Sequence, residues 1–155
     1  MLRRLIIVAL VGVLMALATS TSVSAGENGS AEATMCVSTT QLRAENEVPP
    51  TTSAASGLTQ IKVRNDGTIE FKTHIVNPAR ETFVAGHIHF GEEGTNGPVV
   101  QSLFQGGPNS EERIIQSGEV SNPALGAAIC ADPTAYYINY HTMQFPGGAI
   151  RGQLG

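Results

Sequence analysis

The 155-residue chain has few basic residues, few cysteines and none of the common nucleotide-binding motifs. It carries 9 Lys and Arg against 13 Asp and Glu, which gives a net charge of −4. Because no basic stripe is present, we expect neither nucleic acid nor an anionic membrane surface as a partner. No Walker or dinucleotide-binding fingerprint is found, and no serine lies in a G-x-S-x-G context. The sequence therefore favours neither a nucleotide-dependent enzyme nor a hydrolase.

The first 25 residues have the features of a secretory signal peptide. Arg3 and Arg4 form a positive start, residues 5–18 are almost continuously apolar, and Val23-Ser24-Ala25 is a small-x-small cleavage pattern. The apolar run is shorter than the roughly 20 residues of a membrane span, although an uncleaved anchor is the alternative. We predict cleavage near Ala25, a secreted or periplasmic protein, and no membrane attachment after cleavage.

The rest of the chain is long enough for one domain with a single core. We divide the sequence into a signal peptide (1–25), a flexible polar leader (26–35) and one β domain (36–155). The domain contains both cysteines, Cys36 and Cys130. An even number of cysteines in an exported protein favours a disulfide between them, and two separate buried thiols are the alternative.

Short segments of alternating apolar and polar residues follow one another through the domain. Residues 59–64 and 69–75 alternate most regularly and are joined by Asn65-Asp66-Gly67, which suits a tight turn with positive φ, so they predict a β-hairpin. Further strands are expected at 37–44, 83–91, 99–104, 113–120, 135–142 and 149–154, and one short helix at 123–130. This pattern predicts an all-β, antiparallel, Greek-key-like sandwich or barrel of seven to eight strands with one short helix.

Two histidines, His87 and His89, lie two residues apart in the predicted strand 83–91. Side chains alternate between the faces of a strand, so both imidazoles share one face. Their Cα atoms are about 7 Å apart from the strand rise, which suits two ligands of one metal ion. If the strand that carries His141 is a neighbour, a third imidazole completes an open copper or zinc site. The alternative is structural, with imidazoles that bond backbone groups and shape the loop at 91–98.

The same alternation assigns the two faces of the strands around these histidines. The side expected to face the core carries Val84, Ile88, Phe90, Tyr136, Ile138, Tyr140, Ile150 and Leu154. Tyr137, Asn139 and His141 share the opposite face, and Arg151 and Gln153 are expected to point outward. Glu47 is a candidate partner of Arg151, either in a bidentate ion pair or as one of two solvated charges, and Glu47, Asn139 and Arg151 form a candidate polar cluster. His74, on the wet face of the hairpin, is expected to be solvated.

Four separate blocks of the sequence resemble the CHRD domain, which is named for chordin and also occurs in bacterial secreted proteins. The blocks are residues 42–50 (LRAENEVPP), 85–100 (AGHIHFG and NGPVV), 140–142 (YHT) and 145–154 (FPGGAIRGQL). The resemblance implies an all-β domain that acts as an extracytoplasmic binding or structural module for a protein or a small ligand. Ala149 departs from the pattern, because the family usually has glutamate there. Since His87 and His89 belong to this signature, they do not by themselves argue for an enzyme.

A weaker resemblance is to copper–zinc superoxide dismutase, which also has an H-x-H motif and a later strand histidine. Under this resemblance His87 and His89 match copper ligands, and His141 matches the later ligand. No clear match exists for the histidine that bridges the two metals or for the zinc ligands. The resemblance implies a copper-type metal-binding domain, dismutase-like, as the alternative to an extracytoplasmic binding or structural module.

Overall fold

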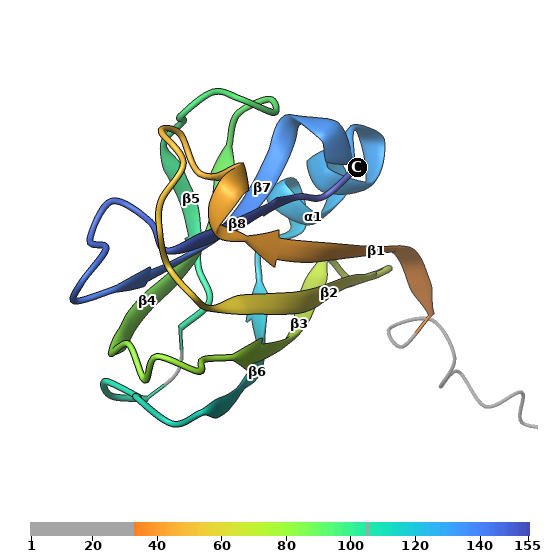
Figure 1. Cartoon of the computed structure of the whole chain (residues 1–155). Coiled ribbons are helices and arrows are strands. Elements are labelled where there is room, and N and C mark those ends of the chain that lie inside the picture. The colour runs from red at the N-terminus through yellow and green to blue at the C-terminus, as the bar shows by residue number, and fades with distance from the viewer. Residues whose placement is uncertain (1–32, 105) are drawn as a thin grey trace, which may run out of the picture.

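The computed structural model describes residues 33–104 and 106–155, and the predicted signal peptide lies outside them (Figure 1). The elements are β1 (Thr34–Arg43), η1 (Ala44–Asn46), β2 (Ser56–Arg64), β3 (Thr68–Val76), β4 (Phe83–Phe90), β5 (Val99–Ser102), β6 (Arg113–Ser121), α1 (Pro123–Ala131), η2 (Pro133–Ala135), β7 (Tyr136–Thr142) and β8 (Ile150–Gln153). Strand β1 begins at Thr34, so residues 34 and 35, which the sequence places in the leader, belong to the first strand. Within this part of the chain no helix is long and apolar enough to span a membrane.

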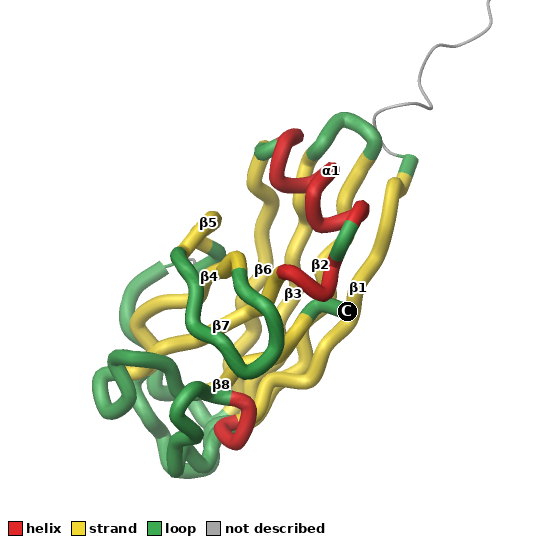
Figure 2. Tube along the Cα trace, turned by 90° about the horizontal axis from the view of Figure 1, so that it is seen from above, coloured by secondary structure: helices red, strands yellow, loops and turns green. Residues whose placement is uncertain are grey.

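The eight strands form one antiparallel sheet in the order β5-β4-β7-β8-β1-β2-β3-β6. The sheet is curled into a half-barrel, as the view along it shows (Figure 2), which confirms the predicted all-β antiparallel class. Its two halves, β5-β4-β7-β8 and β1-β2-β3-β6, are joined where Arg43 of β1 pairs with Arg151 of β8. This junction brings the end of β1 and the following segment, residues 44–51, next to β7 and β8.

The hairpin β2–β3 forms as predicted. Gly67 adopts φ 81°, and the side chain of Asp66 accepts a hydrogen bond from the Thr68 N–H. Buried residues alternate with more exposed ones along both strands. The inner face contributes the buried Ile61, Val63, Ile69, Phe71 and Ile75. Because each strand has only one apolar face, the sheet must curl or be covered to bury it.

Helix α1 closes one end of the half-barrel over the β2–β3 turn (Figure 2). Asn122 caps the helix, since its side chain accepts a hydrogen bond from the Leu125 N–H, and Pro123 is the first helical residue. The predicted disulfide is present, because Cys36 of β1 is bonded to Cys130 of α1. The bridge fastens the helix to the first strand.

Strand β4 contains a β-bulge that the sequence pattern does not predict. The register with β7 shifts between Phe83 and Ala85, so Val84 is an extra residue in a bulge. The prediction that Val84 faces the core is therefore wrong, since Val84 is 37% exposed whereas Phe83 is fully buried. The prediction for Phe90 is also wrong, although for another reason: it keeps the alternation of Ile88 but ends the strand, and it is 51% exposed with its ring against Tyr136. Ile88 keeps its predicted place in the core.

Candidate metal centre

The strands that carry the predicted site residues are neighbours in the sheet. Strand β7 lies between β4 and β8, and its register places Asn139 opposite His87 on one side and Arg151 on the other. His141 pairs with Ala85, one step along the same face from His87. The adjacency on which a three-histidine site depends is therefore present in the fold.

The face that carries these residues is covered, which corrects the expectation that Arg151 points outward into solvent. Arg151 is only 2% exposed and Asn139 only 3%. Loop 91–98 contributes the Glu92 carbonyl, which accepts from Arg151 Nη2, and the segment after β1 contributes Asn46, whose Nδ2 donates to the Arg151 carbonyl. The two loops therefore make a second buried layer on the outer side of β4, β7 and β8.

The three imidazoles converge beside loop 91–98 and the loop between β7 and β8. One candidate ligand atom from each of His87, His89 and His141 lies within 4.8 Å of the other two. Nδ1 of His87 is 3.1 Å from Nε2 of His141, and the ring centroids of His87 and His89 are 5.7 Å apart. Among the described residues this is the one group of three or more His, Cys, Asp or Glu side chains with metal-binding spacing.

Two loop carbonyls fix the orientation of the rings. Nδ1 of His89 lies 2.9 Å from the Gly97 carbonyl oxygen, and Nδ1 of His141 lies 3.0 Å from the Pro146 carbonyl oxygen. A carbonyl only accepts, so in each ring Nδ1 carries the proton and Nε2 keeps its lone pair. This hydrogen bond is the usual support behind a metal-binding histidine.

Burial keeps the imidazoles neutral. Desolvation, with smaller contributions from His141 and His89, lowers the pKa of His87 to about 4. Desolvation also lowers the pKa of His89 and His141, although the carbonyl bonds from Gly97 and Pro146 oppose the shift. Neutral imidazoles are the form that binds metal ions, so the cluster is ready to coordinate at neutral pH.

The donor set fits a transition-metal ion. Nitrogens about 2.0–2.1 Å from one ion lie roughly 3.3 Å apart in a tetrahedral site and at most about 4.2 Å apart. The candidate ligand atoms of His87, His89 and His141 all lie within 4.8 Å of one another, close to this upper limit, so the rings would move slightly closer on binding one ion. Nε2 of His89 is buried and has no hydrogen-bond partner, so its lone pair is available to an ion. His87, His89 and His141 would therefore supply three ligands of an open site.

Tyr137 joins this cluster to Arg151. The imidazole of His89 stacks on the Tyr137 ring with centroids 4.7 Å apart and planes 13° apart, and the Arg151 guanidinium carbon is 3.4 Å from the Tyr137 ring centroid. The Tyr137 hydroxyl also accepts a hydrogen bond from the Gly97 N–H, in the same loop that supports His89. Strand alternation placed Tyr137 on this face but did not reveal its role. The signal is the pairing of β4 with β7, which sets Tyr137 opposite His89, because residues paired across two strands pack against each other.

The predicted polar cluster is present in a different arrangement. Among the described residues Glu47 and Arg151 form no ion pair, so the bidentate pair is absent. Both side chains are buried, so they are not two solvated charges either. Instead Glu47 Oε2 accepts a hydrogen bond from Asn139 Nδ2 at 3.0 Å. Burial raises the pKa of Glu47 to about 7, against the attraction of Arg151 and the bond from Asn139.

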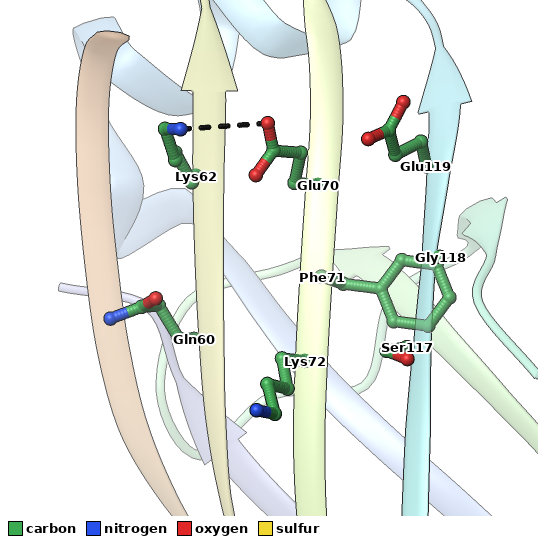
Figure 3. A pocket seen from close by; sticks show the side chains of 8 residues that line it. All are labelled: Gln60, Lys62, Glu70, Phe71, Lys72, Ser117, Gly118 and Glu119. Carbon is green, nitrogen blue, oxygen red and sulfur yellow. Dashed lines mark ion pairs between the residues drawn. The ribbon is translucent and has the colours of Figure 1, made fainter.

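Several hollows lie on the described part of the surface, and none of these four is lined by His87, His89 or His141. One hollow of about 360 Å³ lies on the outer side of β2, β3 and β6, where Lys62 pairs with Glu70 (Figure 3). Phe71, whose side chain belongs to the inner face, pairs with Gly118 in the neighbouring strand. His74 lines another on the same side of the sheet and is exposed, as expected. Glu47 lines two hollows of about 280 and 310 Å³ beside its loop.

Comparison with known proteins agrees with the sequence blocks described above. Neither the curated proteins nor the solved structures contain a match, so the resemblance to copper–zinc superoxide dismutase gains no support from them. The model of one protein family, the CHRD domain, matches residues 38–154, which include every strand from β2 to β8 and all three histidines of the cluster. This chain belongs to the CHRD domain family.

Proposed function

We propose that this CHRD domain is an exported binding module whose ligand is a transition-metal ion held by His87, His89 and His141. The observation that supports the proposal most is the Nε2 atom of His89, which is buried without a hydrogen-bond partner. A buried polar atom left unpaired costs about 1–3 kcal/mol. A bound ion removes that cost, and the candidate ligand atoms of the other two histidines lie within 4.8 Å.

Copper is the ion that this donor set should prefer. Imidazole nitrogens suit Zn²⁺, Cu²⁺ and Ni²⁺, and at a site of given ligands Cu²⁺ binds most tightly in the divalent series. Three protein ligands leave a position for water or a small ligand, as in open metal sites.

Export rests on two independent features. The first 25 residues have the order of charge, apolar run and small residues typical of a cleaved signal peptide. The bond between Cys36 and Cys130 is of the kind that persists in oxidising compartments. We therefore place the processed protein outside the cytoplasm, secreted or periplasmic, where its partner would be an extracytoplasmic protein or a small ligand.

A purely structural role is the second candidate, and two contacts favour it. His89 and His141 each bond a loop carbonyl, from Gly97 and Pro146, as expected of histidines that only shape loops. These bonds use one nitrogen of each ring. They leave the second nitrogen of His89 unexplained, and metal binding accounts for both nitrogens.

The test is a calorimetric titration of the processed, metal-free protein with Cu²⁺ and with Zn²⁺. We expect one site per chain with a dissociation constant below about 1 μM for Cu²⁺, corresponding to roughly 8 kcal/mol, and weaker binding of Zn²⁺. His89→Ala should lose the site, whereas the matched control His74→Ala, on the outer side of the sheet, should bind as the wild type does. Nitrogen couplings from imidazoles in the Cu²⁺ EPR spectrum would identify the ligands.

Binding no tighter than micromolar for either ion would overturn the proposal in favour of the structural role. Equal Cu²⁺ affinity for the wild type and His89→Ala would also overturn it, since the ion would then be held elsewhere on the chain.

A further inference from the structure

Glu47 is a buried acid whose surroundings do not suit a charge. Its side chain belongs to a residue that is 4% exposed, it makes one hydrogen bond, to Asn139 Nδ2, and its second oxygen, Oε1, has no partner. An ionised carboxylate in such a place needs a cation or several donors. Glu47 has neither within bonding distance among the described residues.

A second buried acid shows how this fold can surround a carboxyl group with hydrogen-bond donors. Glu81 is 5% exposed, and the single proton of the Ser53 hydroxyl is shared between its two oxygens. The Ala54 N–H also donates to Oε1, and the Thr142 hydroxyl donates to Oε2. Buried carboxylates are stable when donors saturate them in this way. Glu47 lacks this support, although both acids are equally buried.

Asn139 has the complementary deficiency. Its amide nitrogen donates to Glu47, but its carbonyl oxygen, Oδ1, is buried without a donor. One proton on Glu47 would satisfy both orphaned oxygens, because a carboxylic acid and a primary amide can form a ring with two hydrogen bonds. In this ring Asn139 Nδ2 donates to Glu47 Oε2, and the protonated Glu47 Oε1 donates to Asn139 Oδ1.

We propose that Glu47 is protonated in the folded protein at slightly acidic pH and then forms a cyclic acid–amide pair with Asn139 that fastens segment 44–51 over the outer face of β7 and β8. Loss of the proton removes one bond of the ring and leaves a buried charge. The segment then separates from the sheet more often, so the pair is a pH-sensitive latch over the face that carries Arg151. The latch does not require a bound metal ion.

The other groups around Glu47 leave this proton in place. From β8, Arg151 attracts the ionised form, but its guanidinium is bound to the Tyr137 ring and the Glu92 carbonyl. Gly148 presents only backbone, which lies against the carboxyl group so closely that a Cβ there would be 2.5 Å from Oε2. The neighbouring acids Glu45, on the same segment, and Glu93, in loop 91–98, line the adjacent hollow and supply no positive charge to Glu47.

Burial, the largest influence, raises the pKa of Glu47 to about 7 from its ordinary value of 4.5. If opening of the segment exposes Glu47, the ratio of open to closed forms rises with the difference in proton binding between them. With these two pKa values the ratio increases about tenfold between pH 6 and pH 8.

Infrared spectroscopy of the processed, metal-free protein tests the proton directly. We expect a protonated-carboxyl band that disappears with a midpoint near pH 7 and is absent from Glu47→Gln at every pH. Glu45→Gln, which removes an exposed acid of the same segment, should leave the band unchanged. A Glu47 band that titrates near pH 4.5, or its absence at pH 6, would overturn the proposal.

Amide hydrogen exchange of residues 44–51 tests the latch. After correction for intrinsic rates, the wild type should open about tenfold more often at pH 8 than at pH 6, whereas Glu47→Gln should open equally at both, because an amide preserves the ring without a proton. Equal pH dependence in both proteins would overturn the latch. Either result is independent of whether the histidines bind metal, since no metal is added.

Discussion

Reduction of the Cys36–Cys130 disulfide should destabilise the domain strongly, because the bridge closes a long loop. The two cysteines are 94 residues apart in the sequence. In the chain-entropy model, a cross-link over a loop of this length stabilises the folded state by at most about 4–5 kcal/mol. The bridge joins β1 to α1, so the unlinked helix would be held by its packing alone, through buried residues such as Leu125 and Ile129.

Urea denaturation of the processed protein, with and without a non-thiol reductant, measures this contribution. The double variant Cys36→Ser/Cys130→Ser is the matched control, and it should resemble the reduced wild type and ignore reductant. A single domain of this size carries roughly 5–15 kcal/mol of total stability, so the midpoint should fall markedly. A loss below about 1 kcal/mol would refute the loop-closure reasoning, and two titratable thiols in the native protein would refute the bridge itself.

Two further predictions concern the strand that carries the histidine pair. Gly86→Ala should cost about 1–3 kcal/mol in urea denaturation, because a Cβ at this position would lie 2.4 Å from Cε1 of the Tyr140 ring; unchanged stability would mean that the ring moves freely. The metal-free domain should lose stability as the pH falls from 6.5 to 4, because the pKa of His87 is lowered to about 4 by burial and the unfolded chain therefore binds the proton first. His87→Gln should flatten that part of the profile, and an identical profile in wild type and variant would contradict the shift.

Local sequence patterns predicted the parts of the fold that depend on neighbouring residues. The turn Asn65-Asp66-Gly67 and its flanking strands form as expected, because Gly67 accepts the positive φ that the turn requires. The cap at Asn122 forms for the same kind of reason, since its partner is three residues away. These signals need no knowledge of the rest of the chain.

The parts that were wrong depend on contacts between distant segments. Strict alternation along β4 assigns Val84 to the core, whereas the bulge shifts the pattern and buries Phe83 against Tyr140. Arginine is usually a surface residue, and Arg151 is buried here because loop 91–98 and Asn46 pack over it. No pattern within a single strand carries that information.

The sequence predicted the three histidines of the candidate site but not the backbone groups that orient them. Strand alternation placed His87, His89 and His141 on matching faces, and the fold supplies the adjacency of β4 and β7 that alternation cannot give. The carbonyls that orient the rings belong to Gly97 and Pro146, whose side chains carry no sign of such a role. Backbone hydrogen-bond acceptors of this type can be identified only from the three-dimensional structure.

The position of the tyrosines gives the protein its own optical probe. The chain has three tyrosines and no tryptophan, and Tyr136, Tyr137 and Tyr140 all belong to β7. Tyrosine absorption and emission therefore report on a single strand, the one that carries His141. Because His89 stacks on Tyr137, events at the imidazole cluster and movement of the covering loops reach the chromophores directly, and both can be followed without a label.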